Sequence, residues 1–261
     1  YHFMDEYFSK LPGMHAERMM RATTSMQVSI DFANEADAVR KLRIATLLGP
    51  VFSYLLDNVP VFEGEPNSTP LRRMKVWREV DPVRCGAIPG LFDEGFGFGA
   101  YADWLLSTPP IFITRPDVHS TGSMTAAEAY ADAPMDKADI EHLFSMVWPD
   151  VRLKRYVEIR QGDSVPFDVA LGYAALIKGI FYGETNLDII EHALGVGEDG
   201  IWPYTEQSVE DAIDAVITDE LDAVIYGRTL ESWIGLLFQI APDGLGVEAD
   251  YLEPLMDFKG I

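Results

Sequence analysis

Residues 151–160 read Val-Arg-Leu-Lys-Arg-Tyr-Val-Glu-Ile-Arg, and this stretch constrains the fold more than any other part of the chain. Apolar residues at 151, 153, 157 and 159 alternate with polar ones, which is the period-2 pattern of a half-buried β-strand. On the polar face one carboxylate, Glu158, lies between Lys154 and Arg160, and Arg160 would follow it by roughly 6.5–7 Å along the strand. Such a face suits a site for a metal ion and anionic groups. A cross-strand salt-bridge ladder on an ordinary sheet surface would give the same pattern.

A second half-buried strand is predicted over residues 21–32, where apolar residues alternate with uncharged polar residues such as Gln27 and Ser29. A solvated sheet surface would more usually carry Lys or Glu. A run of hydroxyls and an amide therefore indicates a wet cleft that orients a small polar ligand, with an inert surface as the alternative. Asn34 then predicts the N-cap of a long helix that Pro50 kinks or divides.

Basic residues cluster in the segment that follows a loop rich in Pro and Gly. In a chain with 42 acidic and 20 basic residues, such clustering favours anion binding over randomly distributed surface charge. The basic residues of this segment are Arg72, Arg73, Lys75, Arg78 and Arg84.

The remaining segments predict mainly helices. Residues 94–101 read Glu-Gly-Phe-Gly-Phe-Gly-Ala-Tyr, which lacks the glycine spacing of a dinucleotide-binding loop and indicates aromatic packing before a helix. Two further helices are expected between Ser123 and Trp148, and short helices near 184–193, 205–217, 229–240 and 248–258.

Composition excludes several classes of function. A net charge of −22 opposes binding to nucleic acid or to an anionic membrane surface. No apolar run approaches 18 residues and the first residues lack a signal-peptide pattern, so a cytoplasmic protein is expected. The single cysteine, Cys85, excludes an internal disulfide, and the five histidines have no metal-ligand spacing.

Four segments of the chain follow one another in an order that is specific as a set. They are Gln27–Phe32 with Glu35–Asp37 and Arg40–Lys41, Glu63–Asn67, Trp77 with Asp81–Arg84 and Gly86, and Val151–Arg160. Together they resemble the glutamate–cysteine ligases of the plant and proteobacterial type, and Phe96-Gly97-Phe98 with Tyr101 also fits the pattern of that family.

The resemblance implies an α+β fold in which helices flank a curved antiparallel sheet, as in the catalytic domain of glutamine synthetase. Residues 1–182 would form the catalytic-sheet region, incomplete at its N-terminus, and residues 183–261 a helical region packed on the same domain. The implied reaction is the ATP- and Mg²⁺-dependent ligation of the glutamate γ-carboxylate to the cysteine amine through a γ-glutamyl phosphate, the first step of glutathione biosynthesis. Bringing these anions together requires metal ions and arginines that neutralise charge.

The resemblance also implies roles for individual residues. Glu158 matches a metal-binding glutamate, Gln27 a metal-proximal position on the partner strand, and Arg160 an arginine that contacts the transferred phosphate. Arg73 with Trp77 matches the pocket for the α-carboxylate of glutamate. Arg84 is a further candidate for that pocket, and Tyr156 and Asp163 would hold the binding side chains in place.

The chain departs from the family pattern in two places. Ala22 stands where the family has an arginine, and the family's N-terminal Glu-x-Glu strand, with its further metal ligands, has no counterpart in the sequence. We therefore expect either a fragment of a longer enzyme or a second chain that supplies the missing part. The alternatives are a non-catalytic interaction module with the same fold and a related ligase that uses another amine.

Overall fold

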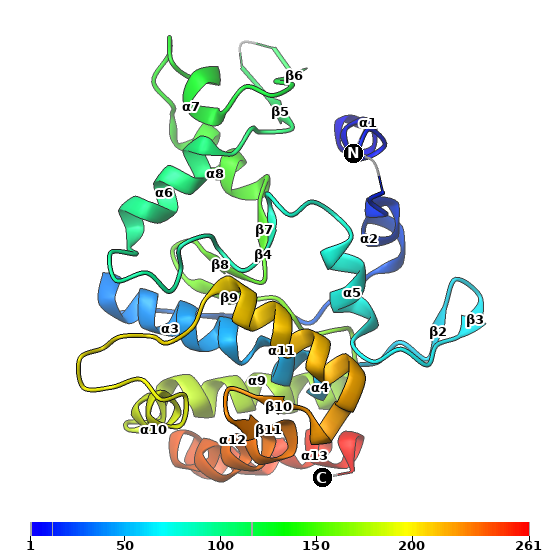
Figure 1. The fold of residues 1–261 in the computed structure, drawn as a ribbon, viewed down its shortest axis with the longest axis vertical. Helices are drawn as coiled ribbons and strands as arrows, with labels where there is room; N and C mark the ends of the chain where they lie inside the picture. The colour runs from blue at the N-terminus through cyan, green and yellow to red at the C-terminus, as the bar shows by residue number, and fades with distance from the viewer. Residues whose placement is uncertain (1, 12, 116, 261) are drawn as a thin grey trace.

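The computed structural model describes residues 2–11, 13–115 and 117–260 and has a mixed α and β fold, which confirms the predicted α+β class (Figure 1). At its centre lies a three-stranded antiparallel sheet in the order β1-β9-β8. Helix α3 (Glu35–Leu47) lies below β8 and β9 in Figure 1, and a lobe that contains α6 (Phe98–Ser107), α7 (Ala126–Ala129) and α8 (Lys137–Ser145) stands above them. The strands are β1 (Val28–Ile30), β8 (Val151–Leu153) and β9 (Val157–Ile159).

Strands β8 and β9 form a hairpin, so the prediction of one continuous strand over 151–160 is wrong. Residues 154–156 make the turn, in which the Lys154 N–H donates to the Tyr156 carbonyl at 2.8 Å. The register places Arg152 opposite Glu158. Because the turn contains an odd number of residues, apolar and polar side chains keep the same alternation between the two faces of the sheet before and after it. The predicted division into an apolar and a polar face is therefore correct. The prediction that the stretch is half-buried is wrong, because the residues of β8 and β9 are buried on both faces.

The second predicted strand is shorter than residues 21–32. Helix α2 (Ala16–Ala22) occupies its beginning, and only Val28–Ile30 joins the sheet, with Ser29 opposite Glu158. Between them the chain is extended without a regular ladder, and Met26 N–H lies 3.2 Å from the carbonyl oxygens of both Gly162 and Asp163.

The helices beneath the sheet begin where the sequence predicts. The Asn34 side chain accepts a hydrogen bond from the Asp37 N–H at 3.1 Å, which caps α3 (Glu35–Leu47). Pro50 lies in the first turn of α4 (Gly49–Leu55), so the predicted long helix is divided at Leu48. Leu42, Ile44, Leu47 and their buried neighbours on α3 and α4 form the middle of the hydrophobic core.

Helix α9 (Phe167–Tyr182) joins the sheet region to the C-terminal helices. At Gly179 the backbone of α12 comes so close that a Cβ atom would lie 2.5 Å from the Ala241 carbonyl oxygen, which explains the glycine. One hydrophobic cluster runs from Ile30 to Leu255 and includes residues of both regions. The four predicted C-terminal helices are confirmed as α10 (Asn186–Ala193), α11 (Glu206–Asp219), α12 (Leu230–Leu245) and the pair η2 (Gly246–Leu252) and α13 (Glu253–Lys259).

The two predicted helices between Ser123 and Trp148 are α7 and α8, and each begins with a capping box. None of the helices in the described ranges is both long and apolar enough to cross a membrane. The remaining elements are α1 (His2–Phe8), β2 (Val61–Phe62), β3 (Glu65–Pro66), α5 (Arg72–Arg78), β4 (Cys85–Gly86), α6 (Phe98–Ser107), β5 (Phe112–Ile113), β6 (His119–Ser120), α7 (Ala126–Ala129), α8 (Lys137–Ser145), β7 (Trp148–Pro149), η1 (Glu220–Asp222), β10 (Val224–Ile225) and β11 (Arg228–Thr229).

Candidate anion-binding site

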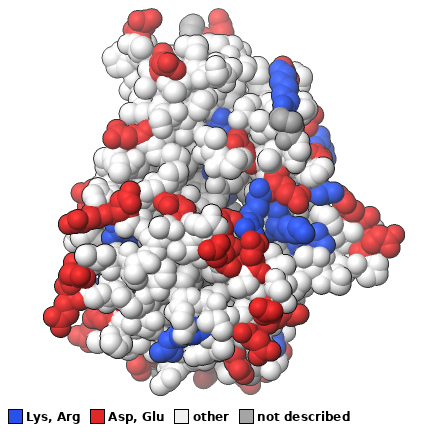
Figure 2. All heavy atoms as spheres, in the orientation of Figure 1, with Lys and Arg blue, Asp and Glu red and all other residues white. Residues whose placement is uncertain are grey.

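Helix α5, the junction between β7 and β8, and the end of β9 meet at one small pocket. Figure 2 shows basic side chains gathered on the side of the molecule where α5 lies, on a face whose other charged side chains are mainly acidic. Leu71 precedes α5 with a φ of 52°, a left-handed conformation that a leucine rarely adopts. Its N–H donates to the Asp57 carboxylate at 3.1 Å and its side chain is buried, which fixes where α5 begins. The pocket is lined by Arg73, Met74, Trp77, Trp148, Pro149, Asp150, Arg160 and Gln161.

Glu158 is buried on the polar face of the sheet, beside this pocket. Its Oε2 atom accepts hydrogen bonds from Arg152 Nε at 2.8 Å and Arg160 Nη1 at 2.9 Å, and its Oε1 atom lies 3.9 Å from Lys154 Nζ. Burial raises the pKa of Glu158, but Arg152 and Arg160 outweigh burial and hold that pKa below its ordinary value. The carboxylate is therefore ionised at neutral pH.

The two arginines that hold Glu158 differ in their remaining donors. Arg152 also donates from Nη1 to the carbonyl oxygens of Phe144 and Val147, each at 3.3 Å. Arg160 donates only from Nη1 to Glu158, and its Nε and Nη2 atoms bond to no other described residue. Arg160 lines the pocket, so its free donors are available to a ligand. Arg152 is a structural support for Glu158.

Arg73 and Trp77 lie one helical turn apart on α5. The Arg73 guanidinium lies 5.3 Å and that of Arg160 5.9 Å from the centre of the Trp77 ring. Arg73 donates to the Thr24 carbonyl at 3.1 Å and to the Arg160 carbonyl at 3.4 Å, but its buried Nε atom has no partner among the described residues. The buried Nε1 of Trp77 has none either. Buried donors are almost always bonded, so an ordered water or a ligand would supply the acceptor for these two.

Burial lowers the pKa of Arg73 to about 10, and the nearby Arg160 adds to this effect while Asp163 and Asp150 oppose it. Burial also lowers the pKa of Arg160, which Arg152 lowers further. Arg73 is nevertheless charged at neutral pH, because a pKa of about 10 lies far above 7. The guanidinium of Arg160 also keeps its charge, since arginine is not deprotonated in proteins. An anion in the pocket would relieve the repulsion between the guanidinium groups.

Four of the residues predicted from the sequence meet here: Arg73, Trp77, Glu158 and Arg160. Gln27 is exposed just before β1 and donates to the Ser25 hydroxyl at 3.1 Å.

Arg84 and Tyr156 do not join them. Arg84 is buried elsewhere, where it donates to Asp81 at 2.9 Å and to the Met146 carbonyl at 3.2 Å, so its guanidinium supports the fold. Tyr156 lies in the hairpin turn, with its ring centre 5.7 Å from Lys154 Nζ.

The predicted set lacked Asp150 and Arg152. In the hairpin Asp150 lies beyond the last pair of the ladder, and its carbonyl accepts from the Arg160 N–H at 3.1 Å, so the two residues face one another. Extending the alternation of residues 151–160 back by one position would have placed Asp150 on the polar face. Asp163, which was predicted to position other residues, is buried, and its Oδ2 atom has no partner among the described residues.

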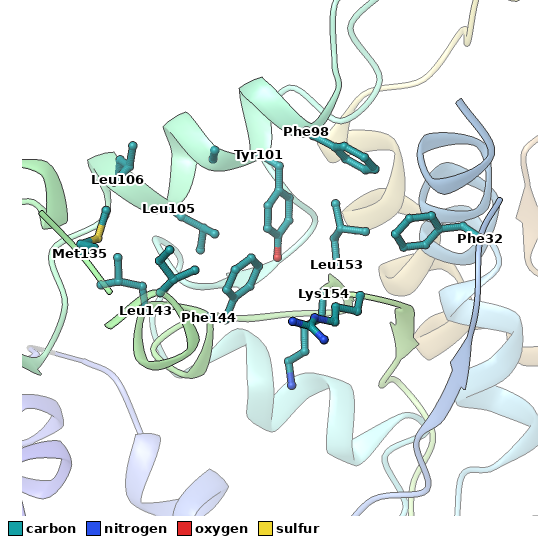
Figure 3. Close-up of a pocket in the computed structure, with 13 residues that line it drawn as sticks. Phe32, Phe98, Tyr101, Leu105, Leu106, Met135, Leu143, Phe144, Leu153 and Lys154 are labelled. Carbon is teal, nitrogen blue, oxygen red and sulfur yellow. The ribbon is translucent and has the colours of Figure 1, made fainter. Parts of the chain in front are cut away.

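A larger pocket of about 520 Å³ lies at the turn end of the hairpin, between α6 and α8 (Figure 3). Figure 3 shows Tyr101 pointing into it between Phe98 and Phe144, near Leu153 and Lys154. The Tyr101 hydroxyl is buried without a partner in the described part of the chain, and burial raises its pKa well above the ordinary value. The lining is mostly apolar and has no carboxylate, so the smaller pocket is the better candidate for acid–base or phosphoryl chemistry.

The described residues include no group of three or more His, Cys, Asp or Glu side chains placed to hold a metal ion. Glu158 has only Oε1 free of arginine contacts, and Gln27 could add one amide oxygen. Mg²⁺ requires an octahedral set of oxygen ligands. These two residues fit part of such a set and not all of it.

The α+β scaffold gathers the buried arginines Arg73 and Arg160 at one small pocket, an arrangement of the kind found in enzymes that act on carboxylate or phosphate anions. Within that class, the chain belongs to the glutamate-cysteine ligase family 2 (GCS2), whose model matches residues 1–255. The resemblance stated from the sequence is thereby confirmed.

Curated relatives agree with the family match. The chain is 31% identical over 198 residues to the chloroplastic glutamate–cysteine ligase of Nicotiana tabacum, and this match covers 73% of the chain and 38% of that protein. It is 32% identical over 195 residues to the chloroplastic enzyme of Medicago truncatula, covering 72% and 38% of the two proteins. It is 32% identical over 198 residues to the chloroplastic enzyme of Arabidopsis thaliana, and this match covers 73% of the chain and 38% of that protein. The matched part of the chain thus spans about two fifths of the length of these relatives.

Proposed function

We propose that this chain carries the glutamate-binding and phosphate-binding part of an ATP-dependent glutamate–cysteine ligase, which makes the first intermediate of glutathione biosynthesis. The observation that carries the proposal is the pocket of Arg73, Trp77 and Arg160, with its two unbonded buried donors, in a member of this family. The reaction begins with a dicarboxylate and a nucleoside triphosphate, both of which are anions that such a pocket attracts.

The proposed roles follow from which donors are free. Arg73 Nε and Trp77 Nε1 would donate to the α-carboxylate of glutamate, because both lack an acceptor. Arg160 would donate from Nε and Nη2 to the phosphoryl group that becomes attached to the γ-carboxylate. Its Nη1 atom stays on Glu158, which fixes the orientation of the guanidinium plane.

ATP and Mg²⁺ are part of the proposal. The metal ion would neutralise charge on the phosphates during transfer. Glu158 Oε1 and Gln27 are the residues of this chain that would contribute to its ligands, and we propose that a segment outside the sequence or a second chain contributes the others. The three-stranded sheet would then be part of a larger curved antiparallel sheet of the glutamine synthetase type.

The direct test is substrate-dependent ADP release by the full-length protein. We expect release to require glutamate and an amine together, with cysteine preferred over other amines. Arg73→Lys should impair the reaction, whereas the matched control Arg72→Lys should not, because Arg72 bonds to Asn67 and Thr69 outside the pocket.

A folded full-length protein that releases no ADP with glutamate and any amine would overturn the enzymatic proposal and favour a non-catalytic interaction module. Activity with glutamate and a different amine would identify a related ligase.

A further inference from the structure

Helix α11, in the C-terminal region, is joined to the last residue of α5 by two ion pairs. Arg78 Nη1 lies 2.7 Å from Asp214 Oδ1, and Arg78 Nη2 pairs with Glu210 Oε2. The two carboxylates are one helical turn apart on α11, so a single guanidinium bridges them. Burial works to lower the pKa of Arg78, but Asp214 and Glu210 outweigh burial and raise that pKa above its ordinary value.

Helix α11 contacts the same part of the chain at a third point. Glu206 Oε1 accepts a hydrogen bond at 2.5 Å from the Gly90 N–H, in the segment that follows β4. Glu206, Glu210 and Asp214 recur at intervals of four residues, so they lie on one side of α11. The buried residues of α11, among them Ile213, belong to the hydrophobic core. Helix α11 therefore connects the core to α5 and to the segment after it.

Helix α5 depends on such contacts for its position. It has seven residues, and a helix of that length is not stable by itself. Leu71, which precedes it, has a left-handed backbone that is unfavourable for leucine. The helix carries Arg73 and Trp77 of the small pocket, and Trp77 directly precedes Arg78. A contact that holds Arg78 therefore also holds the end of α5 from which Trp77 reaches the pocket.

We infer that Glu210, supported by Asp214, is a positioning residue that acts on substrate binding through Arg78 and α5. This rests on the proposed function and deepens it, because it gives the C-terminal helical region a part in substrate binding. The ion pairs would hold Arg73 and Trp77 in place without touching the substrate. Small displacements matter in such a site, because a hydrogen bond weakens steeply when its geometry departs from the optimum.

The direction of the effect on KM separates positioning from plain electrostatics. Burial and the nearby Glu210 raise the pKa of Asp150, which lines the pocket, to about 6. By electrostatics alone, removing the negative charge of Glu210 would make the pocket more attractive to an anion and would lower the KM for glutamate. Removing the positive charge of Arg78 would raise that KM. If the ion pair positions α5, both substitutions raise it.

The test is a double-mutant cycle in the full-length protein, measured as ADP release with glutamate and cysteine. We expect the KM for glutamate to rise roughly 5-fold in Glu210→Gln and roughly 10-fold in Arg78→Gln, which loses both ion pairs. The double variant should equal Arg78→Gln, because its second substitution removes a contact that is already lost. In all three variants kcat and the KM for ATP should stay within about 3-fold of the wild type. Arg78→Lys keeps the charge and should recover part of the loss.

The matched control is Lys178→Gln, which breaks the ion pair of Lys178 with Glu248 between α9 and η2 and should leave the KM for glutamate unchanged. An unchanged or lower KM in Glu210→Gln would overturn the inference, and so would a double variant whose loss is the product of the two single losses. If Arg78→Gln does not fold, the direction of the change in Glu210→Gln decides alone.

A wild type that releases no ADP would remove the proposed function but would leave the positioning of α5 open to a second measurement. Hydrogen exchange of the amides of residues 72–78 should be faster in Arg78→Gln and in Glu210→Gln than in the wild type and in Lys178→Gln. Equal exchange in all four proteins would refute the positioning role.

Discussion

Glu158→Gln removes the charge from a carboxylate that is buried between two guanidinium groups. Viewed from the sequence, Glu158 is a strand-face residue that contributes little to core packing, so its neutral replacement should leave the fold nearly intact. The structure changes that expectation. Arg152 Nε and Nη2 and Arg160 Nη1 lie 2.8, 2.7 and 2.9 Å from Oε2, and Glu158 is 7% exposed.

The magnitude follows from these contacts. Glutamine keeps one acceptor oxygen, but hydrogen bonds between a cation and an anion become hydrogen bonds between a cation and a neutral amide, each of which is weaker by about 1 kcal/mol. Two buried arginines also lose the charge that compensates them, for which the usual cost is about 3–5 kcal/mol when a partner is removed altogether. We expect about 3 kcal/mol of destabilisation at pH 7, or about 6–12 °C in Tm.

The pH dependence separates this reasoning from a simple packing defect. The folded-state pKa of Glu158 lies below its ordinary value of 4.5, so its stabilising effect is fully present above pH 4.5 and is lost as pH falls through the folded-state pKa. The difference in Tm between the wild type and Glu158→Gln should therefore be largest near neutral pH and should narrow as the pH falls below about 4.

The assay is thermal unfolding of both proteins across pH 3.5–7.5, with Glu141→Gln as the control. Glu141 is exposed and lies 3.5 Å from Lys137, so its replacement should change stability by less than about 0.5 kcal/mol. Equal Tm values for Glu158→Gln and the wild type at pH 7, or a difference that does not vary with pH, would refute the electrostatic argument.

Three further substitutions distinguish binding residues from supporting ones. Arg73→Lys should lower kcat/KM for glutamate by roughly 100-fold without changing KM for ATP, because lysine has no Nε–H to donate and no planar fork; steady-state ADP release measures both. Arg160→Lys should lower kcat by roughly 100-fold or more with only a small change in Tm, and a wild-type kcat would show that Arg160 does not bind the phosphate. Arg84→Lys should lower the free energy of unfolding by roughly 3 kcal/mol, because hydrogen bonds to Asp81 and to backbone carbonyls are lost. The kcat of the folded protein should be unchanged. An altered KM for glutamate at unchanged Tm would contradict the structural role of Arg84.

The sequence could predict the two faces of the sheet and could not predict the turn between β8 and β9. Lys154, Arg155 and Tyr156 include none of the glycine, asparagine or proline signals that usually mark a hairpin. Period-2 alternation continues through a three-residue turn, so a hairpin and a single strand give the same pattern. The face of Glu158 was therefore predicted correctly even though the number of strands was wrong.

The same pattern could not distinguish the arginines. Arg152 and Arg160 alternate on one face, and both reach the same oxygen of Glu158. In the folded chain Arg152 Nη1 also donates to backbone carbonyls at the end of α8 and just after it. Arg160 Nε and Nη2 have no such partner among the described residues, and Arg160 lines the pocket. Only the tertiary structure shows this difference. Arg84 illustrates the opposite case, since it belongs to the basic segment by sequence but its donors are used within the fold. Which arginine can bind a ligand thus depends on which donors the fold leaves unbonded, and that property arises from contacts between segments far apart in the chain.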